Sequence, residues 1–200
     1  MYKFLAGNCL IILIISSCNM HKNEVTESPK SKAVPDQYIL LSDSLISFHQ
    51  DTLYWGGNRF SGHAYSLFKS GDSAISGSYL NGLEEGVFKK WYANKQLAES
   101  RIYVDDKKEG THQGWWENGH PKFEYHFING EHEGELKEWY TNGQPYRFFH
   151  YRKGYEEGSQ KMWWQNGAIR ANYVVKSGKK YGLIGLKICA NPYDSVLAKK

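Results

Sequence analysis

Between residues 62 and 185, hydrophobic and polar positions alternate in short runs that recur every 24 residues. The recurrence is marked by six glycines, namely Gly62, Gly86, Gly110, Gly134, Gly158 and Gly182. An aromatic pair follows each of the four middle glycines, at Trp91-Tyr92, Trp115-Trp116, Trp139-Tyr140 and Trp163-Trp164. A turn begins two residues later, at Asn94-Lys95, Asn118-Gly119, Asn142-Gly143 and Asn166-Gly167. Short alternating runs bounded by such turns predict β-strands.

A second set of turns falls in the other half of each unit. It occurs at Gly57-Asn58, Asn81-Gly82, Asp105-Asp106, Asn129-Gly130, Lys153-Gly154 and Ser177-Gly178. Each unit is therefore predicted to be strand, turn, strand, turn. Asn-Gly between strands indicates a type I′ hairpin, in which both central residues have positive φ. The repeat glycines, four of which follow Glu85, Glu109, Glu133 and Glu157, mark a connection that requires a residue without Cβ.

The alternation places aromatic residues on both faces of the sheet. One face is expected to carry Trp91, Trp115, Trp139 and Trp163 with Lys89, Gln113, Lys137 and Lys161. The other is expected to carry Tyr92, Trp116, Tyr140 and Trp164 beside Phe88, His112, Leu136 and Gln160. No helical segment remains to cover either face. We therefore predict an elongated, single-layer antiparallel meander, held by aromatic ladders between equivalent positions and rising by roughly 10 Å per repeat.

Units such as GTHQGWWENGHPKFEYHFINGEHEG resemble MORN repeats, and most closely the bacterial variant found in YwqK-type antitoxins. The resemblance covers about residues 55–185. It implies the repeat fold and a role as an interaction module, and the family supplies no catalytic residues. Antitoxin activity is not carried over, because an exported lipoprotein cannot neutralise a cytosolic toxin.

The N-terminus predicts export and a lipid anchor. Residues 4–15 (FLAGNCLIILII) form a short apolar run, which is typical of a signal peptide. The run ends in Ile15-Ser16-Ser17-Cys18, which resembles the bacterial lipobox and implies that Cys18 is lipidated. The expected location is the cell membrane or the outer membrane, on the periplasmic or surface side, and Asn19 after the cysteine favours the outer membrane.

The chain is accordingly divided into five parts. Residues 1–17 are the signal peptide, 18–37 the lipidated N-terminus and flexible tether, and 38–61 an N-terminal cap and half repeat. Residues 62–185 form the repeat array, and 186–200 a C-terminal edge strand and tail. Residues 36–51 are expected to supply capping strands or a short helix.

Composition and charge argue against several classes of function. The net charge of +4 is interspersed, so there is no nucleic-acid footprint. Glu109 and Glu133 are expected to be about 10 Å apart, farther than the carboxylates of a retaining glycosidase. Cys189 is the one thiol left in the mature chain and is interpreted as a small buried hydrophobic residue. The histidines, which include His112, His120, His126, His132 and His150, are interpreted as exposed strand and turn residues rather than metal ligands. No catalysis, metal or cofactor is expected.

These observations favour a membrane-anchored lipoprotein whose repeat sheet is a non-catalytic interaction or scaffold module in the cell envelope. The candidate surface consists of the eight paired aromatic residues, because Trp and Tyr are enriched among residues that dominate binding energy. The expected partner is an envelope protein. A glycan-binding surface that uses the same aromatic residues remains the alternative.

Overall fold

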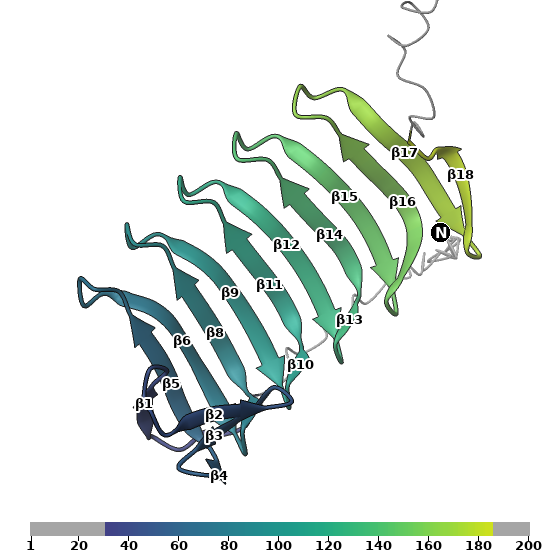
Figure 1. The fold of residues 1–200 in the computed structure, drawn as a ribbon. Helices are drawn as coiled ribbons and strands as arrows, with labels where there is room; N and C mark the ends of the chain where they lie inside the picture. Colours follow the sequence, from purple (N-terminus) through teal and green to yellow (C-terminus); the bar gives the residue numbers. More distant parts are fainter. Residues whose placement is uncertain (1–30, 186–200) are drawn as a thin grey trace, which may run out of the picture.

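The computed structural model describes residues 31–185, which form an all-β protein (Figure 1). A three-residue strand opens the main sheet, and three strands form a separate small sheet. Successive hairpins then follow in chain order. The strands are β1 Tyr38–Leu40, β2 Ile46–His49, β3 Thr52–Trp55, β4 Asn58–Arg59, β5 Gly62–Leu67, β6 Ser73–Leu80, β7 Leu83–Glu84, β8 Gly86–Trp91, β9 Leu97–Val104, β10 Lys107–Lys108, β11 Gly110–Trp115, β12 Pro121–Ile128, β13 Glu131–His132, β14 Gly134–Trp139, β15 Pro145–Arg152, β16 Tyr155–Trp163, β17 Ile169–Lys176 and β18 Lys179–Leu183.

The main sheet confirms the predicted meander. Neighbouring strands pair antiparallel along the order β5-β6-β8-β9-β11-β12-β14-β15-β16-β17-β18. The two-residue strands β7, β10 and β13 pair with the ends of β6, β9 and β12. The sheet is open and elongated, and its hairpins stand side by side along one direction (Figure 1). The six repeat glycines all have positive φ, between 64° and 153°, as expected for connections that disfavour a side chain.

The second set of turns has the predicted type I′ geometry. At Asn129-Gly130, for example, φ is 52° and 85°. The prediction was wrong by one residue at the first turn, where the two central residues are Gly56 and Gly57, with φ of 57° and 81°. There, two consecutive glycines allow positive φ more readily than Asn58 does.

The first set of turns is different, and the type I′ prediction was wrong for it. In the sequence GWWENG only Gly119 has positive φ (84°), whereas Asn118 does not. The backbone N–H of Gly119 donates to Trp116 O at 2.8 Å, and the N–H of Trp116 donates to His120 O at 2.8 Å. The Asn118 side chain accepts from the N–H of His120 at 3.1 Å. This is a type I turn closed by a glycine bulge, and Asn118 stabilises it through its side chain.

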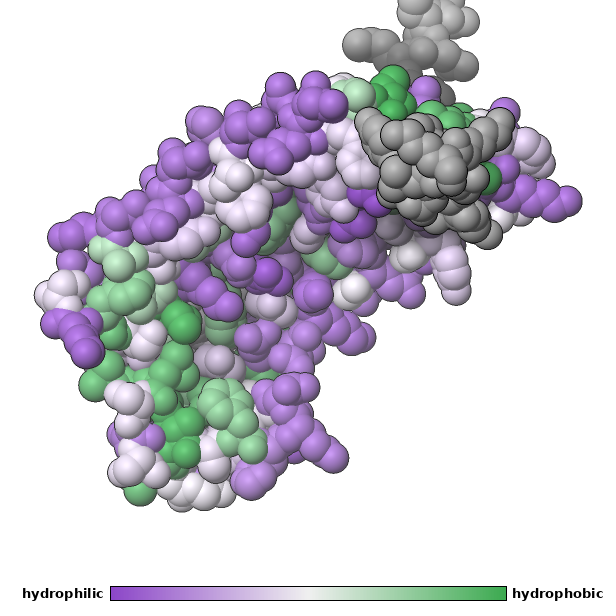
Figure 2. All heavy atoms as spheres, turned by 45° about the horizontal axis from the view of Figure 1, so that its top comes forward, coloured by the Kyte–Doolittle hydropathy of each residue, from purple (hydrophilic) through white to green (hydrophobic). Residues whose placement is uncertain are grey.

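The N-terminal cap departs from the single-layer prediction. β1 pairs parallel with β5, and β2, β3 and β4 form a second sheet that crosses in front of the first hairpins (Figure 1). Leu53 of this sheet is fully buried, and with Ile39 and Phe60 it packs against Ala64 and Tyr79 of the array. Figure 2 shows hydrophobic residues gathered at this end and hydrophilic residues along the row of turns. The first unit therefore has two layers, and the cap is made of strands without the helix that was the alternative.

Beyond the cap, the sheet is held by one row of rings that contact each other across neighbouring strands. The ring centroids are 4.3–5.5 Å apart from one member of the row to the next. The row consists of Tyr79, Phe88, Tyr103, His112, Phe127, His132 and Tyr151. Its members alternate between the two halves of the repeat. The predicted ladders between equivalent positions were wrong, because equivalent residues are separated by an intervening strand that supplies the contacting ring.

The recurring glutamates join one repeat to the next. The carboxylates of Glu85, Glu109 and Glu133 accept the backbone N–H of Asp105, Asn129 and Lys153, at 3.0, 2.7 and 2.7 Å. Each acceptor lies 20 residues before its donor, so each bond joins two consecutive repeats. Glu85 also accepts the backbone N–H of Lys32 at 2.7 Å, and the Lys32 ammonium pairs with Asp105. These glutamates therefore have a structural role.

Candidate binding surface

The first tryptophans of the aromatic pairs lie on the sheet face opposite the ring row. In β11 the side chains of His112 and Trp115 are three positions apart, so alternation places them on opposite faces. All four of these tryptophans are half-buried; they are Trp91, Trp115, Trp139 and Trp163. We call this surface the Trp face. Lys89 and Lys161 flank it as exposed cations.

Two of the four tryptophans are linked by a phenylalanine from the strand between them. The ring of Phe148 in β15 lies 5.5 Å from Trp139 and 5.2 Å from Trp163. The interplanar angles are 69° and 71°, an edge-to-face arrangement that favours aromatic pairs. This part of the Trp face is therefore filled by the protein's own side chains.

A groove opens on the same face between Trp115 and Trp139. Its volume is about 270 Å³, and its wall also includes Gln113, Glu124 and Lys137. Gln113 Nε2 donates to Glu124 Oε2 at 2.9 Å, which holds that carboxylate against β11. The groove thus combines two indole rings with one carboxylate and one ammonium.

A second groove of about 490 Å³ lies further along the same face, over β14, β15 and β16. Phe148 and His150 line it together with Glu135, Arg152 and Lys161. Both charge signs are present, as in the first groove. The ammonium of Lys137 beside Glu135, at 2.6 Å, lowers the pKa of that carboxyl.

The second members of the aromatic pairs have a structural role that the sequence did not indicate. Tyr92 Oη, Trp116 Nε1 and Tyr140 Oη donate to the carbonyl oxygens of Trp115, Trp139 and Trp163, at 3.0, 3.2 and 3.0 Å. Their other contacts are at the turn end, where Lys122 lies over the Trp116 ring and Tyr146 contacts Tyr140. The prediction placed them on the face of Phe88, His112, Leu136 and Gln160; the structure locates them at the turn end, next to the register shift between the two strands of the hairpin. Trp164, the last of the set, is 40% exposed, and Arg170 covers its ring at 4.5 Å.

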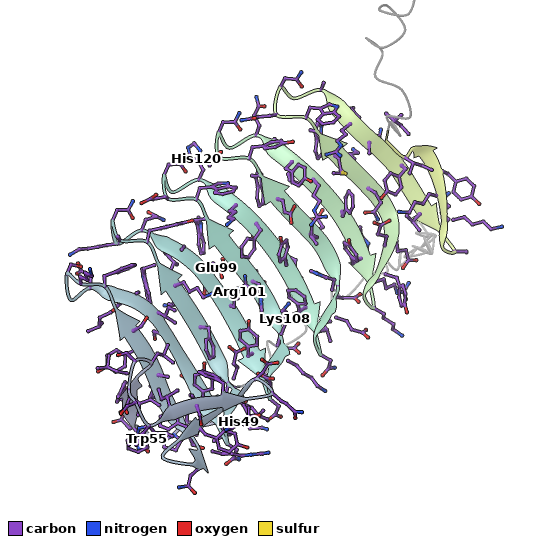
Figure 3. All side chains as sticks on the ribbon, in the orientation of Figure 1. His49, Trp55, Glu99, Arg101, Lys108 and His120 are labelled. Atoms are coloured by element: carbon purple, nitrogen blue, oxygen red, sulfur yellow. The ribbon has the colours of Figure 1, made fainter. Side chains whose placement is uncertain are left out.

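The face of the sheet that carries the ring row, opposite the Trp face, also carries ion pairs that were not predicted from the sequence. Glu99 and Arg101 lie together near the middle of the sheet (Figure 3), with Arg101 Nε donating to the carboxylate at 2.9 Å. Two repeats along, Arg147 pairs with Glu138 at 2.6 Å, and Tyr125 Oη donates to the same carboxylate at 2.5 Å. Cross-strand pairing of Glu138 with Arg147 is the signal that would have identified the second pair.

The histidines are only partly as predicted. His120 lies on an exposed turn (Figure 3), but His112 is fully buried in the ring row, so the prediction of an exposed residue was wrong for it. Its Nε2 is 2.7 Å from Ile102 O, and burial lowers the pKa of the imidazole to about 4. His132 is half-buried in the same row, and burial lowers its pKa as well. No group of three or more His, Cys, Asp or Glu side chains placed to hold a metal ion occurs within residues 31–185.

Cys18, the residue expected to carry lipid, and Cys189 both lie outside the described residues. So do the expected signal peptide and C-terminal tail. Within the described part of the chain, no helix has the length and apolar character needed to cross a membrane.

Comparison with known families matches the repeats seen in the structure. A family model described as a MORN repeat variant matches residues 84–105, 108–129 and 133–152. No curated protein matches the chain. The first match contains β8 and β9, the second contains β11 and β12, and the third contains β14 and β15. The hairpins of residues 84–152 are MORN repeats of the variant type, a repeat that indicates a binding or scaffold module.

Proposed function

We propose that this protein is a membrane-anchored, non-catalytic binding module of the bacterial cell envelope, and that its Trp face holds a partner protein. The observation that carries the proposal is that the two residues of each aromatic pair have different roles. The second members donate hydrogen bonds between repeats, whereas the indoles of two first members, Trp115 and Trp139, line an open groove.

The Trp face has the composition of a protein interface. Half-buried tryptophans stand in a row, and charged side chains of both signs surround them. Tryptophan is enriched among residues that dominate binding energy, and a mixed charged rim provides specificity. The carboxylates of Glu85, Glu109 and Glu133, by contrast, accept backbone amides, so these three repeat glutamates serve the structure of the array.

The membrane anchor is proposed from the lipobox-like sequence that ends at Cys18. The residues after it are polar and carry two prolines, which suits a tether between the lipid and the array. In this arrangement the sheet is displayed beside the membrane, and the partner is another envelope protein.

A glycan partner is the second candidate. The groove between Trp115 and Trp139 brings two indole rings near Glu124 and Gln113, a combination that also suits a sugar ring with hydroxyl groups. The protein partner is favoured, because the grooves recur along a surface much longer than one sugar ring.

Photocrosslinking in native membranes tests the proposal. A photoreactive residue is placed at Lys89 or Lys161 on the Trp face, and at Lys108 on the other face as the control; all three side chains are exposed. We expect one protein to be captured from both Trp-face positions and not from Lys108. Equal capture from all three positions, or capture from Lys108 alone, would contradict the assignment of the face. Retention of envelope polysaccharide without any protein adduct would favour the glycan candidate.

A further inference from the structure

The Trp face contains the same structural slot in successive repeats, filled in one and open in another. The slot lies between consecutive tryptophans, on the second strand of each unit. Phe148 occupies it between Trp139 and Trp163, whereas Glu124 holds the equivalent position between Trp115 and Trp139. Glu124 pairs with Gln113 and Lys137, and Phe148 pairs with Lys137 and Lys161, which lie 24 residues further on in each case, so the registers correspond.

The filled slot shows what the open slot can accept. Phe148 makes edge-to-face contacts with both neighbouring indoles at 5.5 and 5.2 Å. Where Glu124 replaces it, the groove of about 270 Å³ remains between the two tryptophans. A ring inserted there would meet Trp115 and Trp139 as Phe148 meets its own neighbours.

We propose that the groove between Trp115 and Trp139 is an anchor pocket for an aromatic side chain of the partner protein. This inference rests on the proposed function and specifies the chemistry of the partner. The partner residue completes an aromatic ladder that the protein's own sequence leaves interrupted at Glu124.

The charges around the pocket favour a neutral ring over a cation. Glu124 already accepts a hydrogen bond from Gln113 at 2.9 Å, and His126 lies 3.7 Å from its other oxygen. The side chain of Lys137 also lines the groove, and its ammonium is paired with Glu135 at 2.6 Å. A cationic side chain would have to take Glu124 from its present donor, whereas a neutral aromatic ring gains the edge-to-face contacts. A saturated sugar ring lacks the charge distribution on which edge-to-face packing depends.

The pocket can be tested on the full chain in detergent by fluorine NMR. The seven tryptophans are replaced by fluorotryptophan, and their signals are assigned with single Trp→Phe variants. The probe is N-acetylphenylalaninamide, with N-acetylleucinamide and N-acetylglucosamine as comparison probes. We expect the aromatic probe to shift the Trp115 and Trp139 signals with a Kd of about 1 mM, typical of a fragment of this size. The signal of Trp55, which lies in the separate small sheet, should remain in place.

Two substitutions sharpen the result. Glu124→Phe fills the slot with the side chain found one repeat later and should weaken probe binding by about tenfold or more. Glu124→Ala leaves the slot empty and should preserve binding. Glu117→Phe, on the exposed turn of the same hairpin, is the matched control and should bind as the wild type does. An unchanged Trp55 signal, together with an unchanged circular-dichroism spectrum, shows that each variant is folded.

The inference is overturned if the aromatic probe shifts neither tryptophan, if Glu124→Phe binds as tightly as wild type, or if only N-acetylglucosamine shifts them. Crosslinking separates this failure from that of the proposed function. A partner captured equally by wild type and Glu124→Phe would leave the binding function intact and remove the pocket. Capture by neither protein would contradict the function itself.

Discussion

The phenolic hydroxyl of Tyr140 donates a hydrogen bond to the main-chain oxygen of Trp163 at 3.0 Å, and the two residues are 23 positions apart in the chain. Trp116 makes the same bond to Trp139 with its indole N–H, and Tyr92 makes it to Trp115. Tyr and Trp are therefore interchangeable at this position because both combine a ring with a polar hydrogen at its edge. The hydrogen-bond partner lies in the next repeat, so each bond joins two repeats.

Removing one of these bonds should destabilise the array. We expect Tyr140→Phe to lower the free energy of unfolding by about 1 kcal/mol, because the ring is kept and one hydrogen bond is lost. Urea unfolding of the two proteins measures the difference. Tyr155→Phe is the control, since Tyr155 lies in β16, the strand of the acceptor Trp163, and is 80% exposed. Equal losses in both variants would argue that the ladder does not stabilise the sheet.

The glutamate contacts between repeats make a second stability prediction. Glu109 is buried and its carboxylate accepts the N–H of Asn129 at 2.7 Å, so Glu109→Ala removes a hydrogen bond to a charged group that joins two repeats. We expect a loss of about 1–3 kcal/mol in the free energy of unfolding. Glu157 occupies the same repeat position but only approaches Arg152 at 3.8 Å, and Glu157→Ala should cost less than about 0.5 kcal/mol. Similar losses at both sites would contradict the structural role.

His112 should make stability fall as the solution becomes acidic. Its pKa is about 4 in the folded protein and 6.5 for the ordinary side chain, so the unfolded chain binds the proton first. The stability associated with the neutral ring is complete above pH 6.5 and is lost as pH falls from 6.5 to 4, by about 3 kcal/mol in total. His112→Gln should remove this part of the pH dependence, because Gln160 at the equivalent position bonds both backbone groups of His150. Denaturant unfolding at several pH values tests it, and an unchanged slope in the variant would refute the assignment.

Glu84 should make the protein more stable as the solution becomes acidic, which is opposite to the effect of His112. Burial first, and then the neighbouring Asp106, raise the pKa of this carboxyl to about 7; Asp51 adds to the rise, while Arg101 and Lys90 oppose it. The folded protein therefore binds the proton more tightly than the unfolded chain, and stability increases as pH falls from about 7 toward 4.5. Glu84→Gln should abolish this increase and raise stability at neutral pH. A variant that is less stable than wild type at pH 7 would contradict the prediction.

The membrane anchor is tested at Cys18. Cys18→Ala should abolish incorporation of a labelled fatty acid and release the protein into the soluble fraction. Cys189→Ala is the matched control and should remain labelled and membrane-bound. A Cys18→Ala protein that stays in the membrane fraction would exclude the proposed anchor.

Much of the fold could be predicted because the repeat period and the positive-φ positions are properties of single residues. The repeat glycines and Asn129-Gly130 behave as their backbone preferences require. Asn118-Gly119 shows the limit, because the same two residues form a different turn when the loop is longer and the asparagine side chain bonds the backbone. Turn type is set by strand register as well as by residue identity.

The site was predictable only in outline. The row of tryptophans follows from alternation, but its grooves depend on which side chain faces the gap from the intervening strand. Phe148 and Glu124 are equivalent in the repeat, and only the contacts show that one closes the slot and the other leaves it open. The parallel pairing of β1 with β5 has no local signal, because it depends on a segment that returns along the edge of the first hairpin.

The bonds between repeats also fix how this protein can change in length. Tyr140 reaches Trp163, and Glu109 reaches Asn129, only because the intervening residues number the same in every unit. Inserting one residue within a unit would displace the donors from the acceptors of the bonds that span the insertion, whereas duplicating a whole unit would reproduce the same partners. Gene duplication can thus lengthen the protein in steps of one hairpin and leave the existing grooves in register.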